Sequence, residues 1–184
     1  IERKINFQEN YYFNEIDQTA ILLDPYNALK ELIILKGNKL LNEKSLTIKW
    51  KVGIKDNFSE EKTLIEILNH LKSNIKLRID ANGSWKRETA NRWVDILKDI
   101  ENIDWLEQPL SKDDIEGLKE LNKKMPIALD ESLLKYPYLI NEWDGWQIRR
   151  PSQERNPMHL LKELKDKKGF RSLSTSFETE IGRR

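Results

Sequence analysis

Five charged residues recur along the chain at intervals close to the length of one strand–helix unit. Lys51, Asp80, Glu107, Asp130 and Arg150 are separated by steps of 29, 27, 23 and 20 residues. Three carboxylates in one small volume cannot all be ionised without a counter-charge. Mg²⁺ prefers oxygen ligands and keeps positions for water or substrate, and a lysine beside it is a candidate general base. The pattern is therefore typical of a magnesium site, although ordinary solvated residues at strand ends would also fit it.

The elements that must position these residues alternate between short β-prone runs and longer stretches of helical periodicity. The expected strands are residues 19–23, 47–52, 76–81, 103–107, 127–130, 145–149 and 170–174. The expected helices are residues 28–35, 59–73, 87–100, 113–123 and 156–167. Such alternation predicts an α/β protein built from βαβ units with a parallel sheet.

Two α/β architectures fit this pattern, an open doubly wound sheet and a closed (β/α) TIM-type barrel. The chain has seven glycines and none forms a G-x-G or G-K-[ST] motif, which argues against a dinucleotide or nucleotide-phosphate fold. In the strand over residues 76–81, Leu77 and Ile79 face one way, while Arg78 and Asp80 face the other. Because the carboxyl ends of barrel strands form a ring around one mouth, this placement of charge favours the barrel.

Composition excludes several classes of function. The 32 Lys and Arg residues against 31 Asp and Glu leave a net charge of +1, which argues against binding nucleic acid through a broad cationic surface. The chain has no cysteine, so it has no disulfide and no thiolate metal site. No apolar run approaches the roughly 18 residues of a membrane span. We expect a cytoplasmic protein that acts on a small molecule, with neither nucleic acid nor membrane as a partner.

Five ordered motifs resemble the o-succinylbenzoate synthase family of the enolase superfamily, which serves menaquinone and phylloquinone biosynthesis. They are KWKVG (Lys49–Gly53), LRIDANGSW (Leu77–Trp85), WLEQP (Trp105–Pro109), ALDES (Ala128–Ser132) and STSFETEIG (Ser174–Gly182). A single K-x-K motif would be weak support, but five in family order and at family spacing are specific. The resemblance implies a capping domain followed by a modified (β/α) barrel.

The resemblance also implies roles for individual residues. Asp80, Glu107 and Asp130 would bind Mg²⁺, and Lys51 would remove the proton α to the substrate carboxylate. The enediolate that forms would be stabilised by the metal, as is known for this superfamily. Lys51 would then help to expel the hydroxyl group as water, converting succinyl-hydroxycyclohexadiene-carboxylate to o-succinylbenzoate. The further implied residues are Lys49, which would tune Lys51 or touch the substrate carboxylate, Asn82, which would orient Asp80, and Ser174, Thr175 and Ser176, which would bind the succinyl group.

The sequence departs from the family pattern at residue 150 and in its length. The family usually has lysine where Arg150 stands, and arginine stays protonated in proteins, although it can stack on an enediolate through a cation–π contact. A racemase needs a base on each face of its substrate, whereas a dehydratase that works on one face needs only Lys51. An N-acylamino-acid racemase or a muconate-type cycloisomerase is therefore the alternative activity.

The second departure is the short chain, which starts near the first barrel strand and stops after the seventh. We expect residues 1–18 to be a remnant of the capping region or a linker. Residues 19–184 would form a barrel domain that lacks its last strand. The chain would then be a fragment of a longer protein, or a degraded gene product without catalytic activity.

Overall fold

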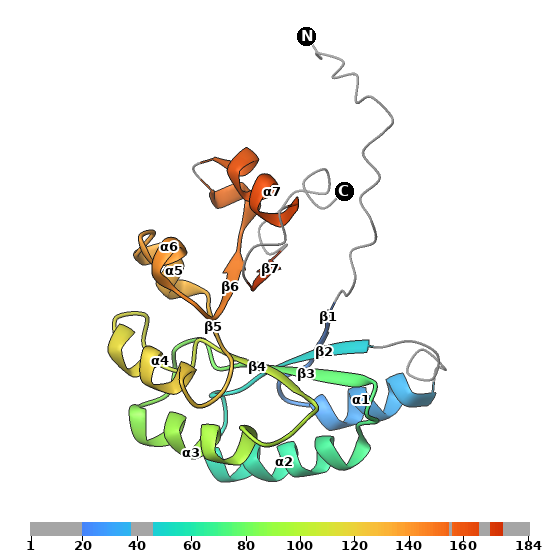
Figure 1. The fold of residues 1–184 in the computed structure, drawn as a ribbon. Coiled ribbons are helices and arrows are strands. Elements are labelled where there is room, and N and C mark those ends of the chain that lie inside the picture. Colours follow the sequence, from blue (N-terminus) through green and yellow to red (C-terminus); the bar gives the residue numbers. More distant parts are fainter. Residues whose placement is uncertain (1–19, 38–45, 155, 166–169, 175–184) are drawn as a thin grey trace, which may run out of the picture.

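In the part of the chain that the structure describes, seven parallel strands form one sheet, in which every strand neighbours the next along the chain (Figure 1). The computed structural model of the protein describes residues 20–37, 46–154, 156–165 and 170–174. The strands are β1 (Ala20–Leu23), β2 (Leu46–Lys51), β3 (Ile75–Asp80), β4 (Ile103–Glu107), β5 (Ile127–Leu129), β6 (Trp146–Arg149) and β7 (Arg171–Leu173). This order, with every pair parallel, confirms the predicted incomplete (β/α) barrel.

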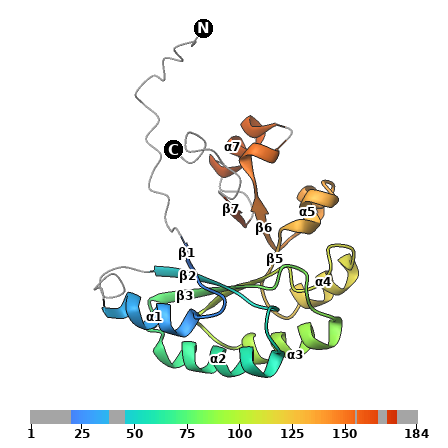
Figure 2. The same ribbon diagram turned by 180° about the vertical axis from the view of Figure 1, so that it is seen from behind.

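Helices follow most strands and cover the outer, convex face of the sheet. They are α1 (Ala28–Gly37), α2 (Asn57–His70), α3 (Arg87–Leu97), α4 (Ile115–Asn122), α5 (Glu131–Lys135), α6 (Leu139–Glu142) and α7 (Pro157–Lys165), with a 3₁₀ turn, η1 (Pro151–Gln153). The view from behind shows α1, α2 and α3 side by side under β1 to β4 (Figure 2). The pairs α5–α6 and η1–α7 occupy the crossovers after β5 and β6.

The main core lies between the sheet and this helical layer. The helical periodicity that the sequence predicts over residues 87–100 is confirmed in α3, where Trp93, Val94 and Leu97 share the buried face. Trp93 stacks on Trp85 with ring centroids 4.8 Å apart and contacts Trp50 of β2 at 6.5 Å. Aromatic pairs of this kind contribute about 1 kcal/mol each beyond the area they bury. The packing fixes the position of β2 and β3 against α3.

The start of α2 differs from the sequence-based expectation that Ser59 opens the helix. Asp56 is the N-cap instead, and its carboxylate accepts hydrogen bonds from the backbone N–H of Ser59 at 3.0 Å and from its hydroxyl at 2.7 Å. Aspartate and serine are about equally favoured as N-cap residues, so the residue types alone do not show which of the two begins the helix. The expectation therefore placed the N-cap three residues too late.

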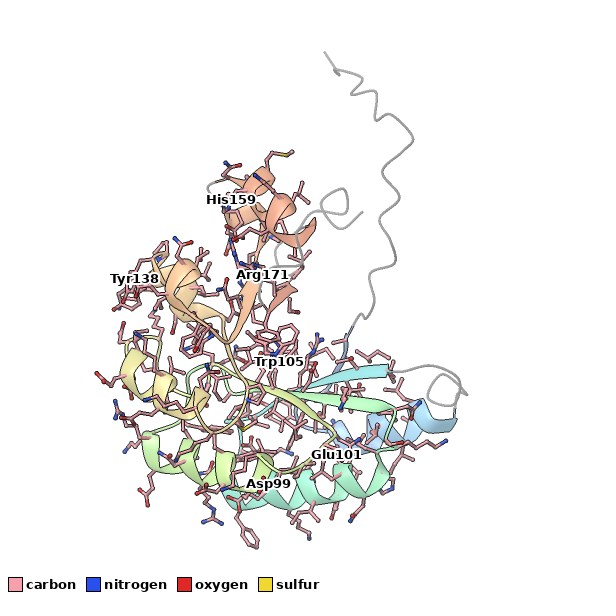
Figure 3. The ribbon with its side chains drawn as sticks, in the orientation of Figure 1. Asp99, Glu101, Trp105, Tyr138, His159 and Arg171 are labelled. Carbon is pink, nitrogen blue, oxygen red and sulfur yellow. The ribbon has the colours of Figure 1, made fainter. Side chains whose placement is uncertain are left out.

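The concave face of the sheet carries a polar and aromatic layer below the strand ends. Arg78 lies over the ring of Trp105, with its guanidinium carbon 3.8 Å from the ring centroid, and donates to Asp104 at 2.8 Å. Trp105 also contacts Trp146 of β6, with centroids 4.2 Å apart. Figure 3 shows Trp105 on the side of the sheet that faces away from α2 and α3. This layer is the floor of the barrel mouth.

Within the described residues, no helix is both long and apolar enough to cross a lipid bilayer.

Candidate active site

Three of the predicted site residues lie at one level of the sheet. In the parallel register, Lys51 of β2 is opposite Asp80 of β3, and Asp80 is opposite Glu107 of β4. Glu107 pairs in turn with Ala128, so Asp130 stands two residues beyond that level, directly after β5. Side chains at one level of a sheet point to the same face. The sheet therefore brings residues separated by a whole strand–helix unit together at the C-terminal rim.

Lys49 lies one pleat below this level and reaches up between two of the carboxylates. Its Nζ atom is 2.8 Å from Oδ2 of Asp80 and 2.7 Å from Oε1 of Glu107. Burial opposes the charge of Lys49, but Glu107 and Asp80 outweigh it and raise the pKa of the lysine above its usual value. Lys49 is therefore a tethered cation that occupies the point where these two carboxylates converge.

Glu107 has the most perturbed carboxyl group in the described part of the chain. Burial first, and the nearby charges of Asp80 and Asp130 in addition, raise the pKa of Glu107 to about 7 despite the opposing effect of Lys49. A single ammonium group thus compensates the negative charge only in part. When both are ionised, the two carboxylates that share Lys49 carry one more negative charge than this lysine offsets.

Arg150 forms an ion pair with the third carboxylate, that of Asp130. Its Nε and Nη2 atoms donate to the two oxygens of Asp130 at 3.0 and 2.5 Å, which is a bidentate pair. Arg150 is 11% exposed and Asp130 is 5% exposed, so the pair is largely shielded from water. The residue that departs from the family pattern is therefore the counter-ion of a predicted metal ligand.

The three carboxylates do not form a metal-binding group as they stand. Among the residues that the structure describes, no three His, Cys, Asp or Glu side chains gather closely enough to hold an ion. The physical reason is that Lys49 separates Asp80 from Glu107, and Arg150 holds the carboxylate of Asp130. The donor set nevertheless fits Mg²⁺ in kind, because all three residues offer carboxylate oxygens at adjacent strand ends and two of them already converge on one cation.

The loop after Lys51 is held by a buried carboxylate that the sequence analysis missed. Glu60 of α2 is 3% exposed. It accepts backbone hydrogen bonds from Gly53, Ile54 and Lys55 at 2.8, 3.0 and 3.0 Å. These contacts fix the strand-to-helix turn immediately behind Lys51. Among the described residues, no side-chain hydrogen bond or ion pair involves the ammonium group of Lys51, which lies opposite Asp80 in the register.

Asn82 contacts Asp80 through its backbone rather than its side chain. Its N–H donates to Oδ1 of Asp80 at 3.0 Å, while its side-chain amide donates to Glu131 at 3.1 Å. Ser174 follows β7 and its N–H donates to the carbonyl of Arg149 at 2.9 Å. The other two predicted substrate contacts, Thr175 and Ser176, lie outside the described residues.

The profile of the family described as "Enolase C-terminal domain-like" matches residues 39–139, more than half of the chain. The chain belongs to this family. The match spans β2 to β5, and so includes Lys51 and all three carboxylates of the rim. Homologues with this domain are enzymes. The expected membership of the enolase superfamily is confirmed.

Individual relatives carry different activities. The chain is 45% identical over 106 residues to o-succinylbenzoate synthase of Thermosynechococcus vestitus, a match that covers 54% of this chain and 33% of that protein. It is 34% identical over 133 residues to N-succinyl-L-Arg/Lys racemase of Bacillus cereus, which covers 66% of this chain and 32% of that protein. The chain thus spans about a third of the length of the curated relatives it matches.

A solved structure supports the same relationship. O-succinylbenzoate synthase from Thermosynechococcus elongatus BP-1, complexed with Mg in its active site, superimposes with a TM-score of 0.71 at 29% identity. The match covers 92% of this chain and 55% of that one. The described residues therefore share the enolase-type fold.

Proposed function

We propose that this enolase-type domain supplies the catalytic barrel of an o-succinylbenzoate synthase. In this proposal it dehydrates succinyl-hydroxycyclohexadiene-carboxylate to o-succinylbenzoate, a step of menaquinone and phylloquinone biosynthesis. The observation that carries the proposal is the register that aligns Lys51 with Asp80 and Glu107 at one level of the rim. A base next to a carboxylate cluster is what removal of a proton α to a carboxylate requires. The 45% identity to a synthase of this type adds support.

In the proposed reaction Lys51 does both proton transfers. Its amine takes the proton α to the substrate carboxylate, and the resulting ammonium gives that proton to the hydroxyl group that leaves from the same face. The C–H and C–O bonds break, a ring double bond forms, and water is released. Glu60 supports this role by holding the turn behind Lys51, which limits the movement of the amine relative to the substrate.

Asp80, Glu107 and Asp130 are the proposed ligands of Mg²⁺. When bound, the ion would neutralise the negative charge that builds on the substrate carboxylate. Lys49 and Arg150 would have to release their carboxylates, and each could then pair with the substrate carboxylate or its ring. In the proposal, Lys49 and Arg150 thus pair with the carboxylates when the ion is absent, and with the substrate when it is bound.

Product formation tests this proposal directly. Because o-succinylbenzoate is aromatic and its precursor is not, ultraviolet absorbance should rise when substrate and Mg²⁺ are added to the protein. The variant Lys51→Ala should abolish the signal. Lys62→Ala removes an exposed lysine of α2 and should retain it. Turnover by the Lys51 variant at the wild-type rate would refute the assignment of the base.

A racemase is the second candidate, favoured by the match to N-succinyl-L-Arg/Lys racemase. Racemisation needs a second base on the opposite face, and Arg150, bound to Asp130, is a poor candidate because arginine keeps its proton. Incorporation of solvent deuterium into both enantiomers of an N-succinyl amino acid would favour the racemase. Absence of both Mg²⁺ binding and cooperative unfolding would instead favour a catalytically inactive remnant.

A further inference from the structure

Gln108 is a fully buried polar residue with a backbone conformation that non-glycine residues seldom adopt. It is 0% exposed and has a φ angle of 37°. Residues in this left-handed region typically cost about 1 kcal/mol or more and persist where surrounding contacts require them. Gln108 directly follows Glu107 and precedes Pro109 in the WLEQP motif, so the unusual turn lies at the rim itself.

The side-chain amide of Gln108 uses its full hydrogen-bonding capacity. Its Nε2 atom donates to the carbonyl of Leu110 at 3.0 Å and to the hydroxyl of Ser132 at 2.8 Å. Its Oε1 atom accepts from the backbone N–H groups of Asp130 and Ser132 at 3.1 and 3.2 Å. An amide has two donors and two acceptor lone pairs, so no capacity remains for a metal ion or a substrate.

The backbone of Gln108 makes two further contacts, one with β5 and one with the turn after β3. Its N–H donates to the carbonyl of Ala128 at 2.8 Å, and its carbonyl accepts from the N–H of Gly83 at 2.6 Å. Gly83 lies in the turn that follows Asp80. One residue therefore connects the turn after β3, the end of β4 and the segment that carries Asp130.

We propose that Gln108 is a positioning residue that sets the spacing of the three rim carboxylates. The inference rests on the proposed function, because it assigns a purpose to the spacing of Asp80, Glu107 and Asp130 as ligands of one ion. Gln108 accepts a hydrogen bond from the backbone N–H of Asp130 and directly follows Glu107 in the chain. Its carbonyl also holds the turn that follows Asp80. A glutamate, which has the same length, cannot replace Gln108, because one of its carboxylate oxygens would then face the carbonyl oxygen of Leu110.

Titration calorimetry with Mg²⁺ tests the proposal on the variant Gln108→Met, which keeps side-chain length and removes all four amide contacts. Gln147→Met is the matched control. Gln147 is also buried, and its amide donates to the carbonyls of Ile140 in α6 and of Trp143, none of which belongs to the carboxylate cluster. Urea unfolding in EDTA should show that both variants are destabilised. Only Gln108→Met should bind Mg²⁺ more weakly, by about 10- to 100-fold.

A milder variant covers the case in which Gln108→Met fails to fold. Ser132→Ala removes one acceptor of the Gln108 amide and should weaken Mg²⁺ binding several-fold. Unchanged affinity in a folded Gln108→Met or Ser132→Ala variant, or an equal loss in Gln147→Met, would overturn the positioning role alone. A wild-type protein that binds no Mg²⁺ would overturn the proposed function and the positioning role together.

Discussion

Replacing Lys49 by methionine should destabilise the metal-free protein in a pH-dependent way. The change removes the ammonium group that lies 2.8 and 2.7 Å from two carboxylates whose side chains are each 2% exposed. Removing one partner of a buried ion pair typically costs about 3 to 5 kcal/mol. Lys49 is itself 23% exposed, so we expect a loss of about 3 kcal/mol from the free energy of unfolding near pH 8.

The pH dependence follows from Glu107. Its pKa in the folded protein is raised from 4.5 to about 7, so the stability associated with its protonated form is present at low pH and is lost as the pH rises through that value. Without Lys49 the pKa should rise further, because the lysine acts to lower it. Near pH 5.5 Glu107 can take up a proton, and the loss caused by Lys49→Met should fall to about half its value near pH 8.

Urea unfolding in EDTA, followed by the fluorescence of the six tryptophans, measures both values. Lys98→Met is the control, because Lys98 is 40% exposed and pairs with exposed Asp95 at 3.5 Å. Such a pair contributes less than about 1 kcal/mol. Saturating Mg²⁺ should recover part of the loss, since binding to the folded state adds stability. A Lys49→Met protein as stable as wild type at both pH values would refute the argument.

Three further predictions follow from the same site. Arg150→Met should lower the free energy of unfolding in EDTA by about 3 kcal/mol, because it leaves the carboxylate of Asp130 without its counter-ion. Urea unfolding with and without Mg²⁺, together with calorimetric Mg²⁺ titration, should show that the ion reduces this loss. An equal loss with and without Mg²⁺ would contradict the assignment of Asp130 as a ligand. The wild-type free energy of unfolding in EDTA should fall by up to about 3 kcal/mol between pH 4.5 and 7 as Glu107 ionises in the folded state; a flat pH profile would contradict the raised pKa. Gly53→Ala should cost roughly 1 to 3 kcal/mol, because Gly53 has a φ of +76° and an added Cβ would lie 1.9 Å from Oγ of Ser84; a thermal melt identical to that of wild type would show that the loop adapts.

The predicted Mg²⁺ ligands, the base and the cytoplasmic location stay predictions, whereas the fold was predictable from the sequence. Strand–helix alternation gave the seven strands, and the observed bounds of β2, β3 and β4 differ from the expected ones by one residue or none at each end. Helices α5 and α6 were not expected. They have five and four residues, which is too short for an apolar stripe of helical period to be recognised.

The sequence alone determined which chemical groups gather at the rim. Side chains alternate along a strand with a period of two, and parallel strands carry their C-terminal residues to one edge, so the face and level of Asp80 and Glu107 follow from their positions in the chain. Only the tertiary structure decided how these groups are paired. Lys49 bridges two carboxylates, Arg150 holds Asp130, and Gln108 joins three loops, because each contact depends on side-chain reach between segments that are 20 or more residues apart.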